Sequence, residues 1–307
     1  MWTMTKRMMI FVTVNILILI SLSLALNLIC AFLGINPNQY YQSLLLISIT
    51  LGFGGAFTSL LLSKFMAKTM MGVQIVDPKT TDPALRHLVQ KIYEFSRAAK
   101  LKNMPEVGIY NSPEVNAFAT GPSKNNSLVA VSTGLLRTMN TDATEGVIAH
   151  EITHIANGDM VTMTLIQGVI NSIVIFAARI IAHIIVNQGR SSNDSRPNPF
   201  LYFGLVMALE ILFSLFGMIA VNYFSRWREY RADAGGAKYA GRDKMISALR
   251  ALQKAYNQGP LDTDDQRKNE AIATFKISGR PRKNKFIALF ATHPQLEDRI
   301  RRLETGR

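Results

Sequence analysis

Long apolar runs alternate with long polar stretches along the 307 residues of this chain. The hydrocarbon core of a bilayer is roughly 30 Å thick and takes about 20 apolar helical residues to cross. The apolar runs that reach this length cover residues 9–33, 44–63, 163–186 and 200–224. They predict four transmembrane helices, although charged side chains interrupt the last two.

The four runs divide the chain into two hydrophobic hairpins and two polar parts. The expected divisions are a transmembrane hairpin over 1–63, a polar part over 64–161, a second hairpin over 162–224 and a polar part over 225–307. Basic residues follow the second and fourth runs, whereas the connection 34–43 carries no charge. Because Lys and Arg beside a span resist translocation, both termini and both polar parts are expected in the cytoplasm.

Two charged side chains inside the third and fourth runs predict a contact between those helices. An ionised group in lipid costs several kcal/mol unless it has a partner. Counted at about 1.5 Å per residue, Arg179 and Glu210 lie at similar depths if both helices cross. We therefore expect an ion pair between them. If the helices instead stop short, both side chains would lie in water or against a polar part.

Composition and charge fit a membrane protein better than a nucleic-acid-binding one. Apolar residues make up 48% of the chain and charged ones 18%, yet the formal net charge is +13. Such a balance suits anionic lipid headgroups. The basic stretch 280–285 and the arginines near the C-terminus lack the interleaved aromatic residues that stack on bases, so no nucleic-acid partner is expected.

The first polar part ends in a predicted helix that starts at Thr141-Asp142, ends near Asn157-Gly158 and carries two histidines four residues apart. At this spacing His150 and His154 project from one face and can bind a single metal ion through their imidazoles. Glu151 lies beside them, where a carboxylate can take a proton from the attacking water. The alternative is two surface histidines and an ordinary glutamate.

A hydrolytic zinc ion needs three protein ligands and one open position. The extended motif with a third histidine is absent, because position 160 is Met160. Glu229 and Asp233 are the candidates: one helical face would carry both, Glu229 as the ligand and Asp233 as the group that orients a ligand histidine. Glu229 could instead pair with an arginine. Asp159 either orients a second histidine or lies at a helix end in solvent.

Several separated motifs, taken together, resemble the HtpX family of membrane heat-shock zinc proteases, distant relatives of the CAAX prenyl proteases. These motifs are Val115–Gly121, His150–His154, Glu229–Gly235 and Thr292–Pro294. The resemblance covers nearly the whole chain. It implies an α+β, mainly helical integral membrane protein of the bacterial inner membrane, with a cytoplasmic zincin-like (gluzincin) protease domain that contains a small β-sheet.

The resemblance also implies roles for the site residues. The three ligand candidates, His150, His154 and Glu229, would bind one Zn²⁺ per chain, with Glu151 as the general base. His293 and Arg299 match residues that approach the substrate or the developing oxyanion. Alternatively, His293 begins a helix and Arg299 faces solvent.

A short segment before the histidine helix resembles the family's edge strand beside the cleft. Its residues are Asn116, Ala117, Phe118 and Ala119. The segments 106–110 and 127–131 are predicted strands that could flank it. An edge strand binds an extended peptide through main-chain hydrogen bonds, which gives little side-chain specificity. For Asn116 the alternative is a plain buried strand.

The predicted function is zinc-dependent endoproteolysis of membrane proteins, misfolded or damaged ones in particular, on the cytoplasmic side. The expected partners are these protein substrates, the lipid bilayer and, in the family's quality-control role, other membrane proteases. Because both zinc motifs adjoin apolar runs, the cleft is expected close to the lipid surface. Two alternatives stay open: a protease for prenylated C-termini, whose relatives have more spans, and a non-enzymatic zinc scaffold, which would need a fourth protein ligand and no base.

Overall fold

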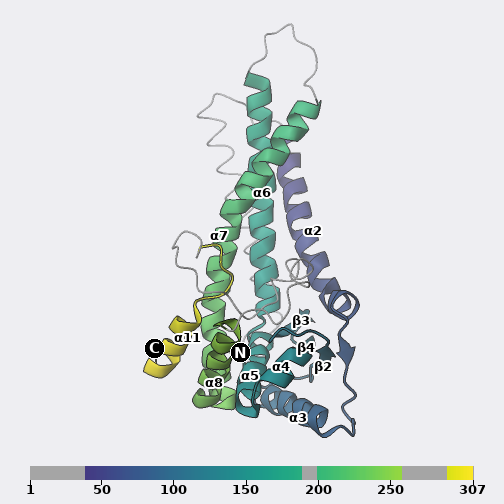
Figure 1. The fold of residues 1–307 in the computed structure, drawn as a ribbon. Coiled ribbons are helices and arrows are strands. Elements are labelled where there is room, and N and C mark those ends of the chain that lie inside the picture. Colours follow the sequence, from purple (N-terminus) through teal and green to yellow (C-terminus); the bar gives the residue numbers. More distant parts are fainter. Residues whose placement is uncertain (1–38, 189–198, 258–288, 307) are drawn as a thin grey trace. The chain divides into compact units, whose positions relative to one another are not determined.

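The structure, a computed structural model, describes residues 39–188, 199–257 and 289–306 (Figure 1). These residues are mostly helical and contain one small mixed sheet. They form two compact units: one contains the described residues within 39–58 and 164–221, and the other contains those within 59–163 and 222–306. The predicted first span, 9–33, lies outside the described residues.

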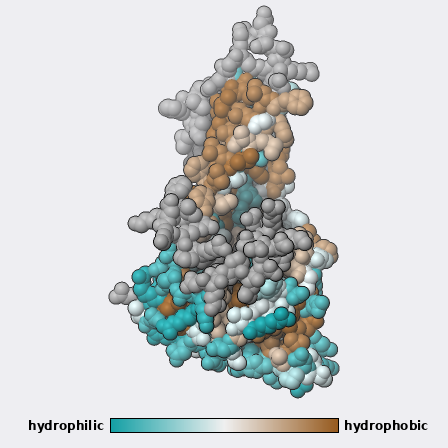
Figure 2. All heavy atoms as spheres, in the orientation of Figure 1, coloured by the Kyte–Doolittle hydropathy of each residue, from teal (hydrophilic) through white to brown (hydrophobic). Residues whose placement is uncertain are grey.

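Three helices in the described part of the chain are long and apolar enough to cross a membrane. They are α2 (Gln39–Met70), α6 (Asp159–Gln188) and α7 (Pro199–Ala240). Each contains one predicted span, and each is longer than predicted. Apolar side chains gather over these helices in Figure 2. At about 1.5 Å per residue, the 42 residues of α7 extend well beyond a hydrocarbon core roughly 30 Å thick.

The first unit packs its helices closely and pairs the charges inside them. A Cβ on Gly52 of α2 would lie 2.3 Å from Oγ of Ser172 on α6. The two helices therefore approach each other closely at a glycine, which has no side chain to hold them apart. The guanidinium of Arg179 on α6 donates to the carboxylate of Glu210 on α7. The expected ion pair therefore forms between the two helices.

Breaking this ion pair should destabilise the protein. Glu210→Ala leaves Arg179 unpaired among apolar helices, which costs several kcal/mol in lipid. We expect a lower melting temperature and less monodisperse protein after detergent extraction. Replacing both residues, as Arg179→Met with Glu210→Leu, should restore most of the loss. Single variants as stable as the wild type would show that the pair is unimportant.

The second unit contains a four-stranded sheet in the order β1-β2-β4-β3. The strands are β1 (Gln74–Ile75), β2 (Glu106–Tyr110), β3 (Ala117–Ser123) and β4 (Asn126–Ser132). β2 runs parallel to β4, and β3 runs antiparallel to it. β3 is an edge strand of this sheet, as predicted, but only β4 flanks it. The tight turn between β3 and β4 makes them neighbours, which leaves β2 to pair with the other side of β4.

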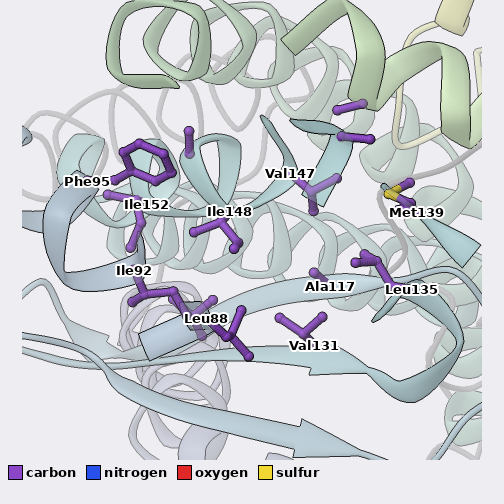
Figure 3. Close-up of a cluster of buried hydrophobic side chains, with 14 of the residues drawn as sticks. Leu88, Ile92, Phe95, Ala117, Val131, Leu135, Met139, Val147, Ile148 and Ile152 are labelled. Atoms are coloured by element: carbon purple, nitrogen blue, oxygen red, sulfur yellow. The ribbon is translucent and has the colours of Figure 1, made fainter. Parts of the chain in front are cut away.

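The main core lies between this sheet and the surrounding helices. It is formed with α3 (Pro83–Ala98), α4 (Thr133–Thr138), α5 (Thr141–Asn157), α8 (Arg242–Asn257) and α11 (Leu296–Thr305). Figure 3 shows Ile92 of α3, Val131 of β4 and Ile148 of α5 within it. Burying one such side chain contributes about 1.5–3 kcal/mol, so α5 is held firmly against the sheet.

Local signals set the ends of α5, and ion pairs tie it to its neighbours. The side chain of Asn140 accepts a hydrogen bond from the Ala143 N–H at 2.8 Å, which caps the helix start. Gly158 ends the helix with a left-handed φ of 72°. Glu145, buried in the second turn of α5, forms an ion pair with Lys244 of α8 at 2.5 Å and lies 3.5 Å from Lys91 of α3. These contacts hold α5 and the side chains that it carries in fixed positions.

Candidate metal centre

Two helices bring three metal-binding side chains together in the interior of the second unit. His150 and His154 come from α5 and Glu229 comes from α7, and all three are buried. The Nε2 atoms of the histidines are 3.1 Å apart. Glu229 places Oε2 3.3 Å from Nε2 of His150 and Oε1 3.4 Å from Nε2 of His154.

A pair of glycines in α7 allows this close approach. A Cβ on Gly235 would lie 2.2 Å from Cγ2 of Thr153, and one on Gly236 would lie 3.2 Å from the backbone nitrogen of His150. Larger residues at these positions would push α7 away from α5. The segment of α7 that supplies the third candidate ligand therefore also carries the small residues that let α5 pack closely against it.

The spacing of these atoms fits a cation with tetrahedral coordination. Zinc–ligand distances of about 2.0–2.1 Å place neighbouring ligand atoms about 3.3 Å apart in a tetrahedron, close to the separations seen here. Oε2 of Glu229 is fully buried and makes no hydrogen bond of good geometry. The donor set of two imidazoles and one carboxylate suits a hydrolytic zinc site.

The electrostatics of the cluster also favour a cation. Burial lowers the pKa of His154, but the carboxylates of Glu229 and Asp159 raise it more, to about 9. Without a metal, the negative surroundings therefore keep a proton on this imidazole. A divalent ion would take the place of that proton, because metal ligands must be deprotonated.

Two further carboxylates hold the outer nitrogens of the histidines. Oδ2 of Asp159 lies 2.6 Å from Nδ1 of His154, and Oδ1 of Asp233 lies 3.0 Å from Nδ1 of His150. Both aspartates are buried, so Asp159 is not a solvent-exposed residue at a helix end. These contacts leave Nε2 of each imidazole directed at the cluster, which is the geometry expected of groups that orient metal ligands.

Arg299 of α11 lies against Asp233 and does not face solvent. Its Nε is 2.8 Å from Oδ2 of Asp233 and its Nη2 is 2.6 Å from Oδ1, and its side chain is fully buried. Nη2 also lies 3.4 Å from Nδ1 of His150. Sequence reasoning missed this link, because the neighbouring Glu297 and Asp298 suggest a solvated helix.

Glu151 and His293 are two further titratable groups at the cluster, where Nη2 of Arg228 also lies 3.4 Å from Oε1 of Glu229. Burial raises the pKa of Glu151, against the opposing effect of His154 and His150. A raised pKa suits a group that must first accept and then return a proton. Nδ1 of His293, just before α11, lies 3.0 Å from Oε2 of Glu229. The structure therefore brings both predicted catalytic residues to the ligand cluster.

The predicted substrate-binding segment lies at the start of β3, on which α5 packs. Asn116 is buried, and its backbone N–H and C=O bond to Oγ and N of Ser132 at 3.1 and 2.9 Å. Ala117 points into the main core, whereas Phe118 packs on the opposite face of the sheet. Since these side chains are buried, β3 can offer a ligand chiefly its backbone.

Replacing one orienting carboxylate should weaken metal binding without removing a ligand. We expect Asp159→Asn to lower the affinity for zinc about 10- to 100-fold, because the amide no longer polarises the imidazole of His154. Titration with a competing chelator measures the change. The exposed Asp243→Asn serves as the control. Equal affinities in the two variants would contradict this role.

Comparisons with known proteins agree with this site. Residues 79–306 match peptidase family M48. A protease HtpX homolog of Bacillus licheniformis is 48% identical over 309 residues, or 98% of this chain and 99% of that protein. Protease HtpX of Shewanella sp. strain MR-4 is 48% identical over 282 residues, or 91% and 93% of the two chains. In fold, the chain resembles the crystal structure of S. mikatae Ste24p.

The likeness to Ste24p has a TM-score of 0.60 at 16% identity, and it covers 96% of this chain but 66% of that one. It therefore supports the fold alone. The family match and the HtpX relatives go further, because they span the buried histidine and glutamate cluster and most of the chain. The chain belongs to peptidase family M48 and is a membrane metalloprotease related to HtpX.

Proposed function

We propose that this metalloprotease uses zinc to cleave membrane proteins, misfolded or damaged ones above all, on the cytoplasmic side of a bacterial inner membrane. The observation that carries the proposal is the buried cluster of His150, His154 and Glu229, with donor atoms 3.1 to 3.4 Å apart. The lysines and arginines that follow the apolar runs support the cytoplasmic orientation. Residues 64–161 and 225–307 would form the hydrolytic part, working beside other quality-control proteases of the membrane.

The chain's own residues provide the steps of peptide hydrolysis around this ion. Zinc held by the three ligands would supply a Lewis acid and an acidified water. Glu151 would take the proton from the attacking water and return it to the leaving amine. His293 would donate a hydrogen bond to the oxyanion that develops on the scissile carbonyl. Asp159 and Asp233, the latter held by Arg299, would keep the imidazoles in place.

The edge strand β3 is the proposed substrate-binding element. An extended substrate segment would add to the edge of β3 that faces away from β4, through main-chain hydrogen bonds. Because Ala117 and Phe118 are buried, their side chains would not select the substrate. The affinity would therefore depend on an extended backbone more than on a particular residue sequence. Misfolded proteins expose such segments, whereas folded proteins bury them.

The test compares three substrates of the purified protein in lipid nanodiscs: a membrane protein with an unfolded cytoplasmic loop, the same protein correctly folded, and a peptide with a prenylated C-terminus. We expect rapid cleavage within the unfolded loop, loss of cleavage with a zinc chelator, and recovery on adding zinc back. Preferential cleavage of the prenylated peptide would favour the alternative enzyme. If the zinc-loaded protein cleaves none of the three substrates, the proposed function is wrong.

A further inference from the structure

The part of α7 that carries Glu229 has two opposite faces. One face is buried and polar, and it contains Asn222, Ser225, Glu229 and Asp233. The other is exposed, with Tyr223 and Trp227 at 64% and 55% relative exposure. Residues 222, 225, 229 and 233 follow helical spacing, as do 223 and 227, so the division is a property of a single helix.

The exposed face ends in a cation. The guanidinium of Arg231, one turn after Trp227, lies over the indole ring at 4.7 Å from its centroid. Phe224 adds a third exposed aromatic side chain at 44%. Along the exposed face of α7, the apolar span is followed by aromatic residues and then by Arg231. Arg226 precedes Trp227 in sequence, but it donates to the backbone carbonyls of Leu289 and Ala291.

This order matches the boundary between lipid and water. Tyr and Trp are enriched at that boundary because their rings are apolar and their tips are polar, and Arg extends its charge toward phosphates. The exposed aromatic face is continuous in sequence with the apolar span of the same helix. The chain's net charge of +13 also complements anionic headgroups. The occupant of this face that fits best is the headgroup layer of a bilayer.

We propose that Tyr223, Trp227 and Arg231 form an interfacial anchor that fixes the depth of the metal centre. Glu229 lies two residues after Trp227, which is about 3 Å along the helix axis. The catalytic ion would then be held at headgroup level. This depth assignment rests on the proposed function. It restricts the substrates to membrane proteins with a peptide bond within a few residues of the point where their own chain leaves the membrane.

Fluorescence of Trp227 tests the anchor without requiring activity. The chain has two tryptophans, so Trp2→Phe leaves Trp227 as the single reporter, and Glu151→Gln keeps the protein inactive during the measurement. The full-length protein in nanodiscs is exposed to lipids brominated near the headgroup, to lipids brominated deep in the acyl chains, and to aqueous iodide. We expect the shallow bromines to quench most. A protein with Trp227→Phe as well provides the background.

Three other outcomes would overturn the anchor. Dominant quenching by iodide would place Trp227 in water. Dominant quenching by the deep bromines would place it in the hydrocarbon. Protection from all three quenchers would mean that protein, such as a second copy of this chain, covers the face.

A spacer series tests the consequence for substrates. Each model substrate has a transmembrane helix, an uncharged flexible spacer of graded length and the same cleavable sequence. An extended chain spans about 3.3 Å per residue, so a centre at headgroup level should cut substrates with spacers of about two or three residues. A requirement for about eight or more residues would overturn the depth assignment. If no spacer is cut, the proposed function fails together with the substrate class, and the fluorescence result still decides the anchor.

Discussion

Glu151→Gln should abolish proteolysis while leaving metal binding nearly intact. The amide has almost the shape of the carboxylate but cannot accept the proton of the attacking water. General acid–base groups contribute about 10²- to 10⁴-fold to rates, and Glu151 would act in two proton transfers, so we expect at least the upper part of that range. The two imidazoles and Glu229 remain, and the zinc content should stay near one per chain.

The measurement combines a cleavage assay with elemental analysis of the same preparation. Glu94→Gln, an exposed glutamate on α3, controls for the loss of a negative charge and should behave as the wild type. Cleavage by Glu151→Gln at a rate close to that of the wild type would refute its role as the base. Loss of zinc together with activity would instead place Glu151 among the groups that hold the ion.

Glu229→Ala should have the largest effect on metal binding. The substitution removes one of three proposed ligands and leaves the imidazoles without the carboxylate that faces them at 3.3 and 3.4 Å. Because loss of an orienting group alone costs about 10- to 100-fold in affinity, loss of a ligand should exceed 100-fold. At the zinc concentration that half-saturates the wild type, cleavage by Glu229→Ala should fall to background.

Zinc titration against a competing chelator measures this affinity, and circular dichroism shows whether the helices remain. Glu229→Asp offers a milder companion, because it keeps the charge but shortens the reach by about one carbon–carbon bond, and it should retain part of the affinity. If Glu229→Ala binds zinc as tightly as the wild type does, a different residue is the third ligand. The reaction scheme would then need to be redrawn around that residue.

Local patterns predicted the elements that depend on neighbours in sequence. The start of α5 follows from a polar cap and its end from Gly158, both of which act within one turn. The apolar runs located three helices in the described part of the chain, since the length of a span depends only on the thickness of the bilayer. Their exact ends were missed, because α7 stays helical well past the apolar run 200–224.

Contacts between distant segments were harder to predict. Sequence spacing suggested that Asp233 could orient a histidine, but the full burial of Arg299 against Asp233 depends on how α11 packs beside α7. The partner of β3 was predicted only in part, because strand order depends on how the strands pair across the whole sheet.

The sequence by itself determined the chemistry available: two imidazoles one helical turn apart, a glutamate beside them, and apolar runs long enough for a membrane. These features are local, so spacing and composition suffice to reveal them. The tertiary structure decided which distant groups join that pair, and it brought Glu229, His293 and the buried pair of Asp233 and Arg299 to one centre. Only packing could do so, because the meeting of α5 with α7 depends on glycines and core contacts that no short stretch of sequence contains.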